Sequence, residues 1–450
     1  MKRLTKGSLT GLMLLLISFS VKAQTEYSLQ QSIEYALLNN ENILNAELTM
    51  RDADAQVFET RADGLPQITG NFNYNNSLVI PRSPIPTAFI TGNPADEGVV
   101  QVAFGAQHSG NFGINATQMI WDGSFFIGLQ AAKMLREKVV VDKVKAEVDV
   151  IEQVTKAYYL VLVNETRVGL IDANIANLDS TLRETRVLYE NGFAEKIDVS
   201  RLQVQMNNLS AERKGVEQGV NVSLNLLKLS MGMPISEEIT LTDPLEGIDF
   251  EYNLNDINSF SLQERVEVQQ INYLRKLAEL DIKNTYSQYI PKVEFSAGWG
   301  RNTGTNDFSD VWKGDRWFSN SAIGINVSIP IFDGLRKKYT VQRKKIQLQT
   351  LDNQYKQLTN SLSQDLVNAR EALDVSLERL AVQQANLDLA REVSDITREK
   401  YREGVGSNLE VLNAEEDYKE SETNYLSALY DAIIAKVDLN KALGKLKDQQ

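Results

Sequence analysis

Two acidic residues stand at equivalent places in the two halves of this sequence, where carboxylates could act on ions or on helix ends. Each belongs to the same pattern: a tyrosine, a glycine three positions on, and then, six positions after the glycine, an acidic residue followed by valine. Repetition of this kind indicates a duplicated structural unit. The pattern occurs twice, 212 residues apart, at Tyr189, Gly192, Asp198 and Val199 and at Tyr401, Gly404, Glu410 and Val411.

Two roles are open to Glu410. Ser407-x-x-Glu410 has the form of a capping box, in which the glutamate carboxylate accepts a hydrogen bond from the amide of the cap residue. At a narrow mouth the same carboxylate would favour cations. The sequence supports the two roles equally.

The sequence contains few of the residues on which enzymes commonly rely for catalysis. His108 is the only histidine and there is no cysteine, so proton transfer by histidine, thiol nucleophiles and thiolate metal sites are not expected. The glycines at 298, 300 and 304 lack the spacing of a phosphate loop. The net charge of −13, from 47 basic and 60 acidic residues, argues against nucleic acid. We therefore expect no enzyme, no metal, no cofactor and no nucleic-acid partner.

A second repeated motif, Ile-aromatic-Asp-Gly, occurs at 120–123 and 331–334, where a strand pattern gives way to a helix pattern. Asp122 and Asp333 are predicted to cap the helices that follow, with Gly123 and Gly334 next to them. Pro330 is predicted to end its strand, where a missing backbone donor is tolerated.

Four segments alternate between apolar and polar residues, as β-strands do. They are predicted to form two hairpins, 67–121 and 291–332. Their polar faces carry mostly Asn, Ser and Thr, as in a water-filled lumen, with Lys292 and Glu294 at the start of the third strand as exceptions. A half-buried soluble sheet has the same period. The apolar faces are Ile68, Gly70, Phe72 and Tyr74; Phe104, Ala106, Phe112, Ile114, Ala116 and Ile120; Val293, Phe295, Ala297 and Trp299; and Ile323, Ile325, Val327, Ile329 and Ile331.

Four strands cannot close a barrel alone, because the smallest transmembrane barrels have about eight. Open sheet edges are not tolerated in lipid, so strands that cross a membrane here must share a barrel with other chains. The connecting loops at 81–96 and 300–320 are predicted to face solvent.

Two segments are predicted to form very long helices. Residues 124–189 contain no proline, and 335–402 contain neither proline nor glycine, which gives helices on the order of 100 Å at 1.5 Å per residue. Apolar residues recur at steps of seven in both, with Ser394 the polar exception, which indicates coiled-coil packing. Shorter helices are predicted at 28–63, 197–231, 256–288 and 407–443, so that two placed end to end match one long helix.

The N-terminus has the features of a secretory signal peptide at 1–23: basic residues, an apolar run at 9–21 and a small-x-small site at 21–23. An uncleaved anchor helix is the alternative, but the run is shorter than the roughly 20 residues that span a bilayer. The remainder is predicted to comprise a first repeat at 24–232, a linker at 233–255 and a second repeat at 256–450. Ile239–Leu241 in the linker is predicted to form a short strand.

The doubled layout, the segments 118–123 and 329–334 and the two helix tips resemble the TolC-type outer-membrane efflux proteins over essentially the whole mature chain. The resemblance implies a mainly helical chain with a transmembrane β-barrel. Three copies would form one twelve-stranded barrel in outer-membrane lipid, continued by a helical tunnel through the periplasm. The implied function is a passive exit duct for small molecules, with a periplasmic adaptor and an inner-membrane transporter of the RND or ABC type as partners.

In that family the helix tips form the periplasmic aperture. Gly406 stands where some relatives have an arginine that ties the aperture shut, and it cannot make that link. We hypothesise that threefold rings of Glu410 and Asp198 make the entrance cation-preferring. The resemblance places Asp198, Tyr401, Glu410 and Asn413 at the aperture, with Asn413 where a second acid is often found, and it places Gly192 and Gly404 where the adaptor docks.

Two other functions fit parts of the pattern. The same fold could serve type I protein secretion, with a different cargo. A soluble coiled-coil scaffold would explain the seven-residue stripes but not the four strands.

Overall fold

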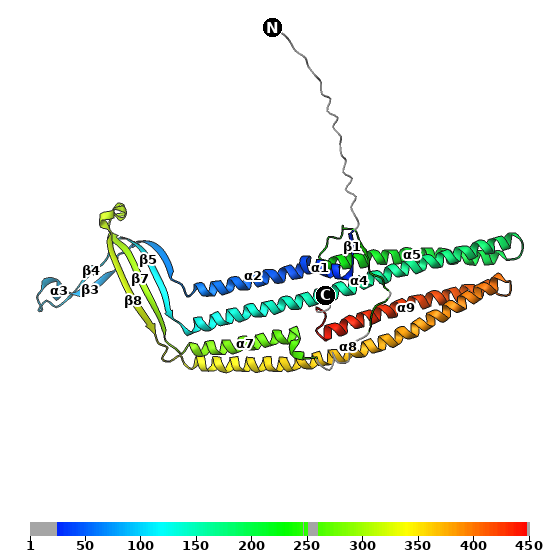
Figure 1. The fold of residues 1–450 in the computed structure, drawn as a ribbon. Coiled ribbons are helices and arrows are strands. Elements are labelled where there is room, and N and C mark those ends of the chain that lie inside the picture. Colours follow the sequence, from blue (N-terminus) through cyan, green and yellow to red (C-terminus); the bar gives the residue numbers. More distant parts are fainter. Residues whose placement is uncertain (1–24, 246, 251–259, 448–450) are drawn as a thin grey trace, which may run out of the picture.

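The computed structural model describes residues 25–245, 247–250 and 260–447. It consists of a long helical body with a four-stranded sheet at one end (Figure 1). The predicted signal peptide and the first residues of the helix predicted at 256 lie outside the described residues. Within the described ranges, no helix is long and apolar enough to cross a membrane.

The sheet is antiparallel with strand order β2-β5-β7-β8, so the two predicted hairpins join through the pairing of β5 with β7. Within one chain, neither the outer side of β2 nor that of β8 has a strand partner in the described structure. The sheet is therefore open, as expected for a barrel that several copies complete. Its strands are β2 (Gln67–Asn76), β5 (His108–Trp121), β7 (Lys292–Thr305) and β8 (Phe318–Ser328).

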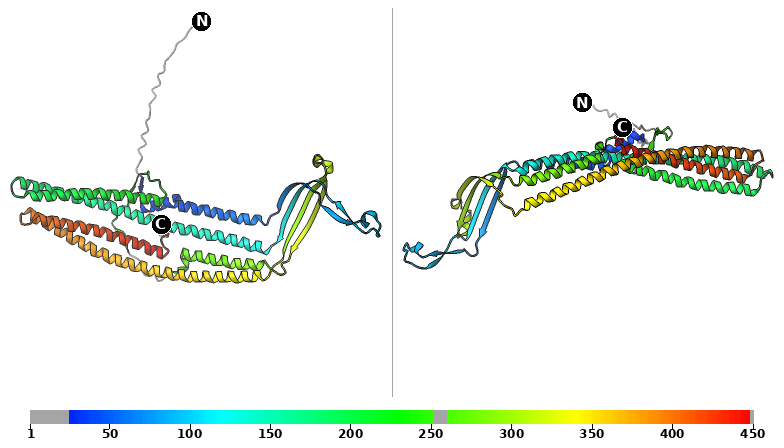
Figure 2. Two further views of the ribbon diagram at one scale, coloured as in Figure 1. Left: turned by 180° about the vertical axis from the view of Figure 1, so that it is seen from behind. Right: turned by 90° about the horizontal axis from the view of Figure 1, so that it is seen from below.

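Three predictions about the sheet need correction. The second strand begins at His108 and not at Phe104. The predicted loop at 81–96 contains part of an additional small hairpin. It consists of β3 (Arg82–Pro86) and β4 (Val99–Ala103), with the short helix α3 (Ala88–Thr91) between them. This additional hairpin projects away from the sheet (Figure 2). β8 ends at Ser328, so Pro330 lies beyond the strand, because a residue without an N–H cannot continue the ladder.

The loop between β7 and β8 is also ordered. It contains two short 3-10 turns, η2 (Phe308–Trp312) and η3 (Gly314–Arg316). Phe308 and Trp312 fold back onto the apolar face of the sheet, where Trp312 stacks on Phe72 and Phe308 meets Tyr74 edge-on. Aromatic packing thus covers the end of the sheet farthest from the helices.

Two very long helices per chain, as predicted, form the body: α4 (Gly123–Glu190) and α8 (Arg336–Arg402). Shorter helices lie along them: α2 and α5 lie along α4, α9 lies along α8, and α7 contacts both long helices (Figure 1). The helix predicted at 28–63 is in fact two, because the side chain of Asn40 accepts a hydrogen bond from the Asn42 amide and starts a new helix. The short helices are α1 (Leu29–Asn39), α2 (Glu41–Ala62), α5 (Lys196–Met231), α7 (Val266–Ser287), preceded by the 3-10 turn η1 (Leu262–Glu264), and α9 (Asn408–Ala442).

The short helices meet end to end at two similar junctions. In the first half, the Asn40 side chain donates to the Ser230 carbonyl at 2.8 Å, and Gly232 ends α5 with φ +70°. In the second half, Arg265 donates to the Ala442 carbonyl at 2.7 Å, and Gly444 follows α9 with the same φ. Each junction supplies donors to carbonyls that a helix end leaves unpaired.

The main core lies where these junctions pack against the middle of α4. Val154, Tyr158 and Val161 are fully buried there. The Tyr158 hydroxyl donates to the Tyr27 carbonyl, and so holds β1 (Thr25–Tyr27) against α4. β1 pairs in parallel with β6 (Ile239–Leu241), the short strand predicted in the linker.

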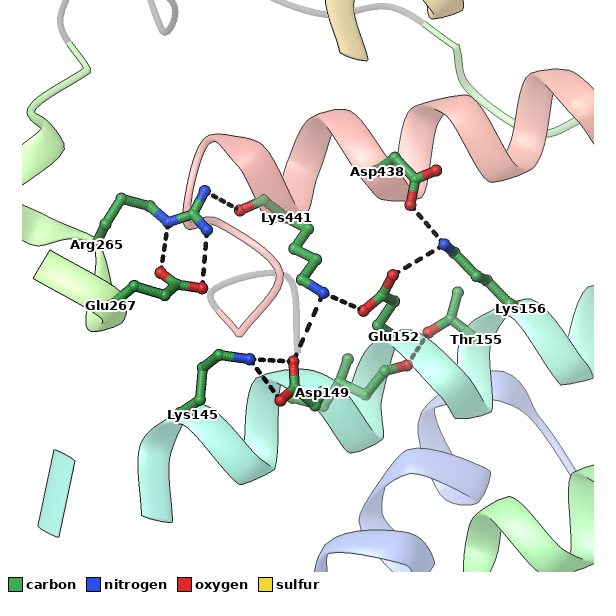
Figure 3. Close-up of polar contacts among 10 residues, drawn as sticks. Lys145, Asp149, Glu152, Thr155, Lys156, Arg265, Glu267, Asp438 and Lys441 are labelled. Atoms are coloured by element: carbon green, nitrogen blue, oxygen red, sulfur yellow. Dashed lines mark hydrogen bonds and ion pairs between the residues drawn. The ribbon is translucent and has the colours of Figure 1, made fainter. Parts of the chain in front are cut away.

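Ion pairs tie the end of α9 to the same part of α4 (Figure 3). Lys441 contacts both Glu152 and Asp149, and Lys156 contacts Glu152 at 2.9 Å. Burial alone would raise the pKa of Glu152, but the ammonium groups of Lys156 and Lys441 lower it below its usual value. The carboxylate therefore stays charged and bridges the two helices.

Candidate functional site

The two repeated tyrosine-glycine-acid patterns lie at the helical turns farthest from the sheet, at the ends of α4 and α8 (Figure 2). Gly192 and Gly404 have φ values of +80° and +76°, and no atom lies within 4 Å of the Cβ that a larger residue would place there. The backbone conformation requires glycine at these turns, since a left-handed φ is strained for other residues. Both glycines are exposed.

Side-chain contacts join the two turns. The hydroxyl groups of Tyr401 and Thr185 lie 3.1 Å apart, which links the end of α8 to α4. Arg402 pairs with Glu184 at 3.4 Å, but this pair is nearly half exposed and contributes little on its own. Tyr401 is thus placed to couple the two turns.

The two repeated carboxylates have different surroundings. The Asp198 carboxylate accepts a hydrogen bond from the Glu195 amide at 3.2 Å, and so performs the capping role predicted for Glu410. At the second turn only half of the capping box forms. Ser407 Oγ accepts a hydrogen bond from the Glu410 amide, but within the described structure the Glu410 carboxylate accepts none from the Ser407 amide. Glu410 is exposed, so its charge is directed at solvent.

Asn413 and Gly406 lie on either side of Glu410. Asn413 is exposed and stands three residues after Glu410, on the same face of α9. The Gly406 amide donates to the Lys400 carbonyl, and a Cβ at Gly406 would lie 3.1 Å from the Tyr401 nitrogen. A larger side chain at Gly406 would therefore displace the turn that holds Tyr401.

Sequence reasoning missed the buried polar residues behind the turns. Glu422 of α9 is 6% exposed and accepts a hydrogen bond from Asn174 of α4 at 2.8 Å. Ser394, the polar residue in the α8 stripe, is buried and donates to Glu415, which Arg398 also contacts. Asn408 is buried with neither amide atom hydrogen-bonded in the part of the chain described. Of these residues, only Ser394 could be noticed in the sequence, because it interrupts the seven-residue apolar repeat of α8.

The strand-to-helix junctions differ between the halves. Asp122 caps α4: its carboxylate accepts from the Ser124 amide at 2.8 Å and pairs with Lys292 at 2.6 Å. Asp333 does not hold the corresponding position, because Gly334 and Leu335 both have positive φ and delay the start of α8 to Arg336. The Asp333 carboxylate instead accepts from the Lys337 amide at 3.0 Å, inside the first turn. The backbone beside Gly123 is crowded, since a Cβ there would lie 3.0 Å from Ser287.

Comparison with known proteins gives consistent results. The sequence model of a family described as "Outer membrane efflux protein" matches residues 32–233 and 259–445. Outer membrane protein TolC of Vibrio cholerae is 21% identical over 419 residues, covering 91% of this chain and 89% of TolC. The probable efflux pump outer membrane protein TtgC of Pseudomonas putida is 21% identical over 426 residues, covering 93% of this chain and 83% of TtgC.

Solved structures share the fold. The outer membrane protein VceC of Vibrio cholerae superposes with a TM-score of 0.70 at 17% identity, covering 92% of this chain and 96% of VceC. The open state of the Neisseria gonorrhoeae MtrE outer membrane channel gives 0.70 at 21% identity, covering 93% and 89%.

Proposed function

The chain belongs to the outer membrane efflux protein family, and on that premise we propose that it is a passive exit duct for small molecules. It is an outer-membrane efflux channel protein whose helices extend into the periplasm. The observation that carries the proposal is the family match over both halves, together with a sheet that is open on both sides in one chain. The soluble scaffold is thereby set aside.

The chain acts as one component of an efflux pump, which implies an adaptor and an inner-membrane transporter as partners. We propose that the transporter is of the RND or ABC type and that the adaptor contacts the turns at Gly192 and Gly404. Exposure of these two glycines supports that contact. Relatives named for the efflux of antibiotics or toluene and for pyoverdine export support a small-molecule cargo. The duct itself performs no chemical step.

We also propose that the turns form the aperture of the duct and that Glu410, with Asn413 beside it, faces the opening. The exposed Glu410 carboxylate supports this role, since its charge is not used in capping. Asp198 contributes less, because its carboxylate is held by the Glu195 amide. The Tyr401–Thr185 contact would hold the aperture narrow.

Single-channel recording in planar bilayers tests the proposal. Glu410→Gln should reduce the preference for cations, because it removes one carboxylate per copy from a narrow opening. Glu34→Gln, the same change on an exposed residue of α1, is the matched control. Unchanged selectivity and conductance in Glu410→Gln would remove Glu410 from the aperture, and a wild-type protein without conductance would contradict the duct itself.

A further inference from the structure

A chain of asparagine side chains crosses all four strands of the sheet on its polar face. Asn115 donates to Asn71 at 3.1 Å, and Asn71 donates to Asn111 at 3.1 Å. Asn111 in turn donates to Asn302, which donates to Asn320 at 3.4 Å. We call Asn71, Asn111, Asn115, Asn302 and Asn320 the amide belt.

Glycines on neighbouring strands make room for this belt. Three belt residues have a glycine as their register partner: Asn71 faces Gly113, Asn115 faces Gly298 and Asn320 faces Gly300. A Cβ on any of these glycines would lie 3.0–3.1 Å from the carboxamide oxygen of the facing asparagine. The asparagine side chains therefore lie flat over the glycines instead of standing out from the sheet.

The belt surface carries no formal charge. Between Thr69 and Asn75 on β2, the positions of this face and their register partners on β5, β7 and β8 include no ionisable side chain. Nearer the helices, the same face carries Glu294 on β7, whose register partners are Met119 and Asn326. Each belt amide uses at most one N–H and one acceptor lone pair within the chain of hydrogen bonds, so further donors and acceptors remain for water or solute. The opposite face carries Ile68, Phe72 and Ile114 and is suited to lipid.

We propose that the amide belt lines the lumen of the shared barrel and determines what the barrel admits. At the level of the belt, asparagine side chains that lie flat keep the bore wide, and their uncharged amides admit cations, anions and neutral polar solutes alike. In a threefold assembly the belts of successive copies follow one another around the lumen. This inference rests on the proposed duct function.

Two substitutions test the belt in planar-bilayer recordings of the full-length protein. Asn320→Asp keeps the side-chain shape and still accepts from Asn302, so it should shift the reversal potential toward cation selectivity. Asn93→Asp, outside the sheet in the projecting hairpin region, should leave selectivity unchanged. Gly298→Val should push Asn115 into the lumen and lower the single-channel conductance.

Gly70→Val is the matched control for crowding, since no atom lies within 4 Å of a Cβ at Gly70 on the opposite face. Its conductance should equal that of the wild type. Wild-type conductance and selectivity in both Gly298→Val and Asn320→Asp would overturn the proposal and leave the belt a purely structural ladder. A wild-type protein that assembles but does not conduct would contradict the duct function instead.

Discussion

Arg265 holds the junction between α7 and α9, and its replacement by methionine should loosen that junction. The guanidinium is 7% exposed, donates to the carbonyls of Lys441 and Ala442 at 3.0 and 2.7 Å, and makes two 3.0 Å bonds to Glu267. Arg265→Met would leave the Glu267 carboxylate without its cation and two helix-end carbonyls without donors. Removing one partner of a buried ion pair costs about 3–5 kcal/mol.

Hydrogen exchange measured by mass spectrometry reports this loss locally. The amides near the end of α9 should exchange at least about 100-fold faster in Arg265→Met, since a tenfold change in an equilibrium corresponds to about 1.4 kcal/mol. Arg265→Lys should give an intermediate value, because lysine keeps the charge but not the planar fork.

Arg275→Met is the matched control. Arg275 lies on α7, the helix that Arg265 immediately precedes, and pairs with Asp352 at 2.7 Å, but both side chains are more than one-third exposed. Exposed pairs of this kind contribute about 0–1 kcal/mol. Equal exchange rates in the two methionine variants would show that burial does not make the Arg265–Glu267 pair more stabilising than the exposed Arg275–Asp352 pair.

Two further outcomes are expected. Burial, and secondarily the charge of Glu415, raises the pKa of Glu422. Hydrogen bonds to Asn174 and Tyr418 and the nearby Arg391 of α8 lower this pKa but do not cancel the rise. The stability that this carboxyl contributes is therefore present below its unfolded pKa and is lost as pH rises through its folded pKa. Glu422→Gln should stabilise the tip half of α9 at neutral pH and flatten its pH dependence, measured by hydrogen exchange between acidic and neutral pH, and an unchanged pH profile would contradict this. Gly232→Ala should destabilise the end of α5 by more than the roughly 1–2 kcal/mol of left-handed strain, because its Cβ would lie 2.6 Å from the Asn39 carbonyl. Gly444→Ala carries the same strain without that clash, and equal losses in the two variants would show that crowding at Gly232 does not matter.

The fold was largely predictable because apolar residues recur at regular intervals along its strands and long helices. The four alternating strands and the proline-free helices follow directly from spacing in the sequence. The break at Asn40 was missed because asparagine also occurs in helix interiors. The start of α8 was predicted to within one residue, but its cap was wrongly assigned to Asp333, because Leu335 adopts a left-handed conformation that its residue type does not suggest. The boundaries of the two repeats at 232 and 256 stay predictions.

The candidate site was predictable only in outline. The repeat located the two turns, but not which carboxylate would cap its helix, since Asp198 and Glu410 stand in equivalent sequence contexts. The amide belt depends on register across strands more than 190 residues apart, as between Asn111 and Asn302. Single-strand alternation identifies the polar face but not which of its side chains touch.

Electron cryomicroscopy of the full-length protein in lipid nanodiscs would show whether several copies of this chain share one barrel and one lumen. We expect three copies, with β8 of each paired to β2 of the next, one closed barrel and a continuous lumen lined by the amide belts. A different number of copies, or a β2–β8 closure within one chain, would contradict this expectation.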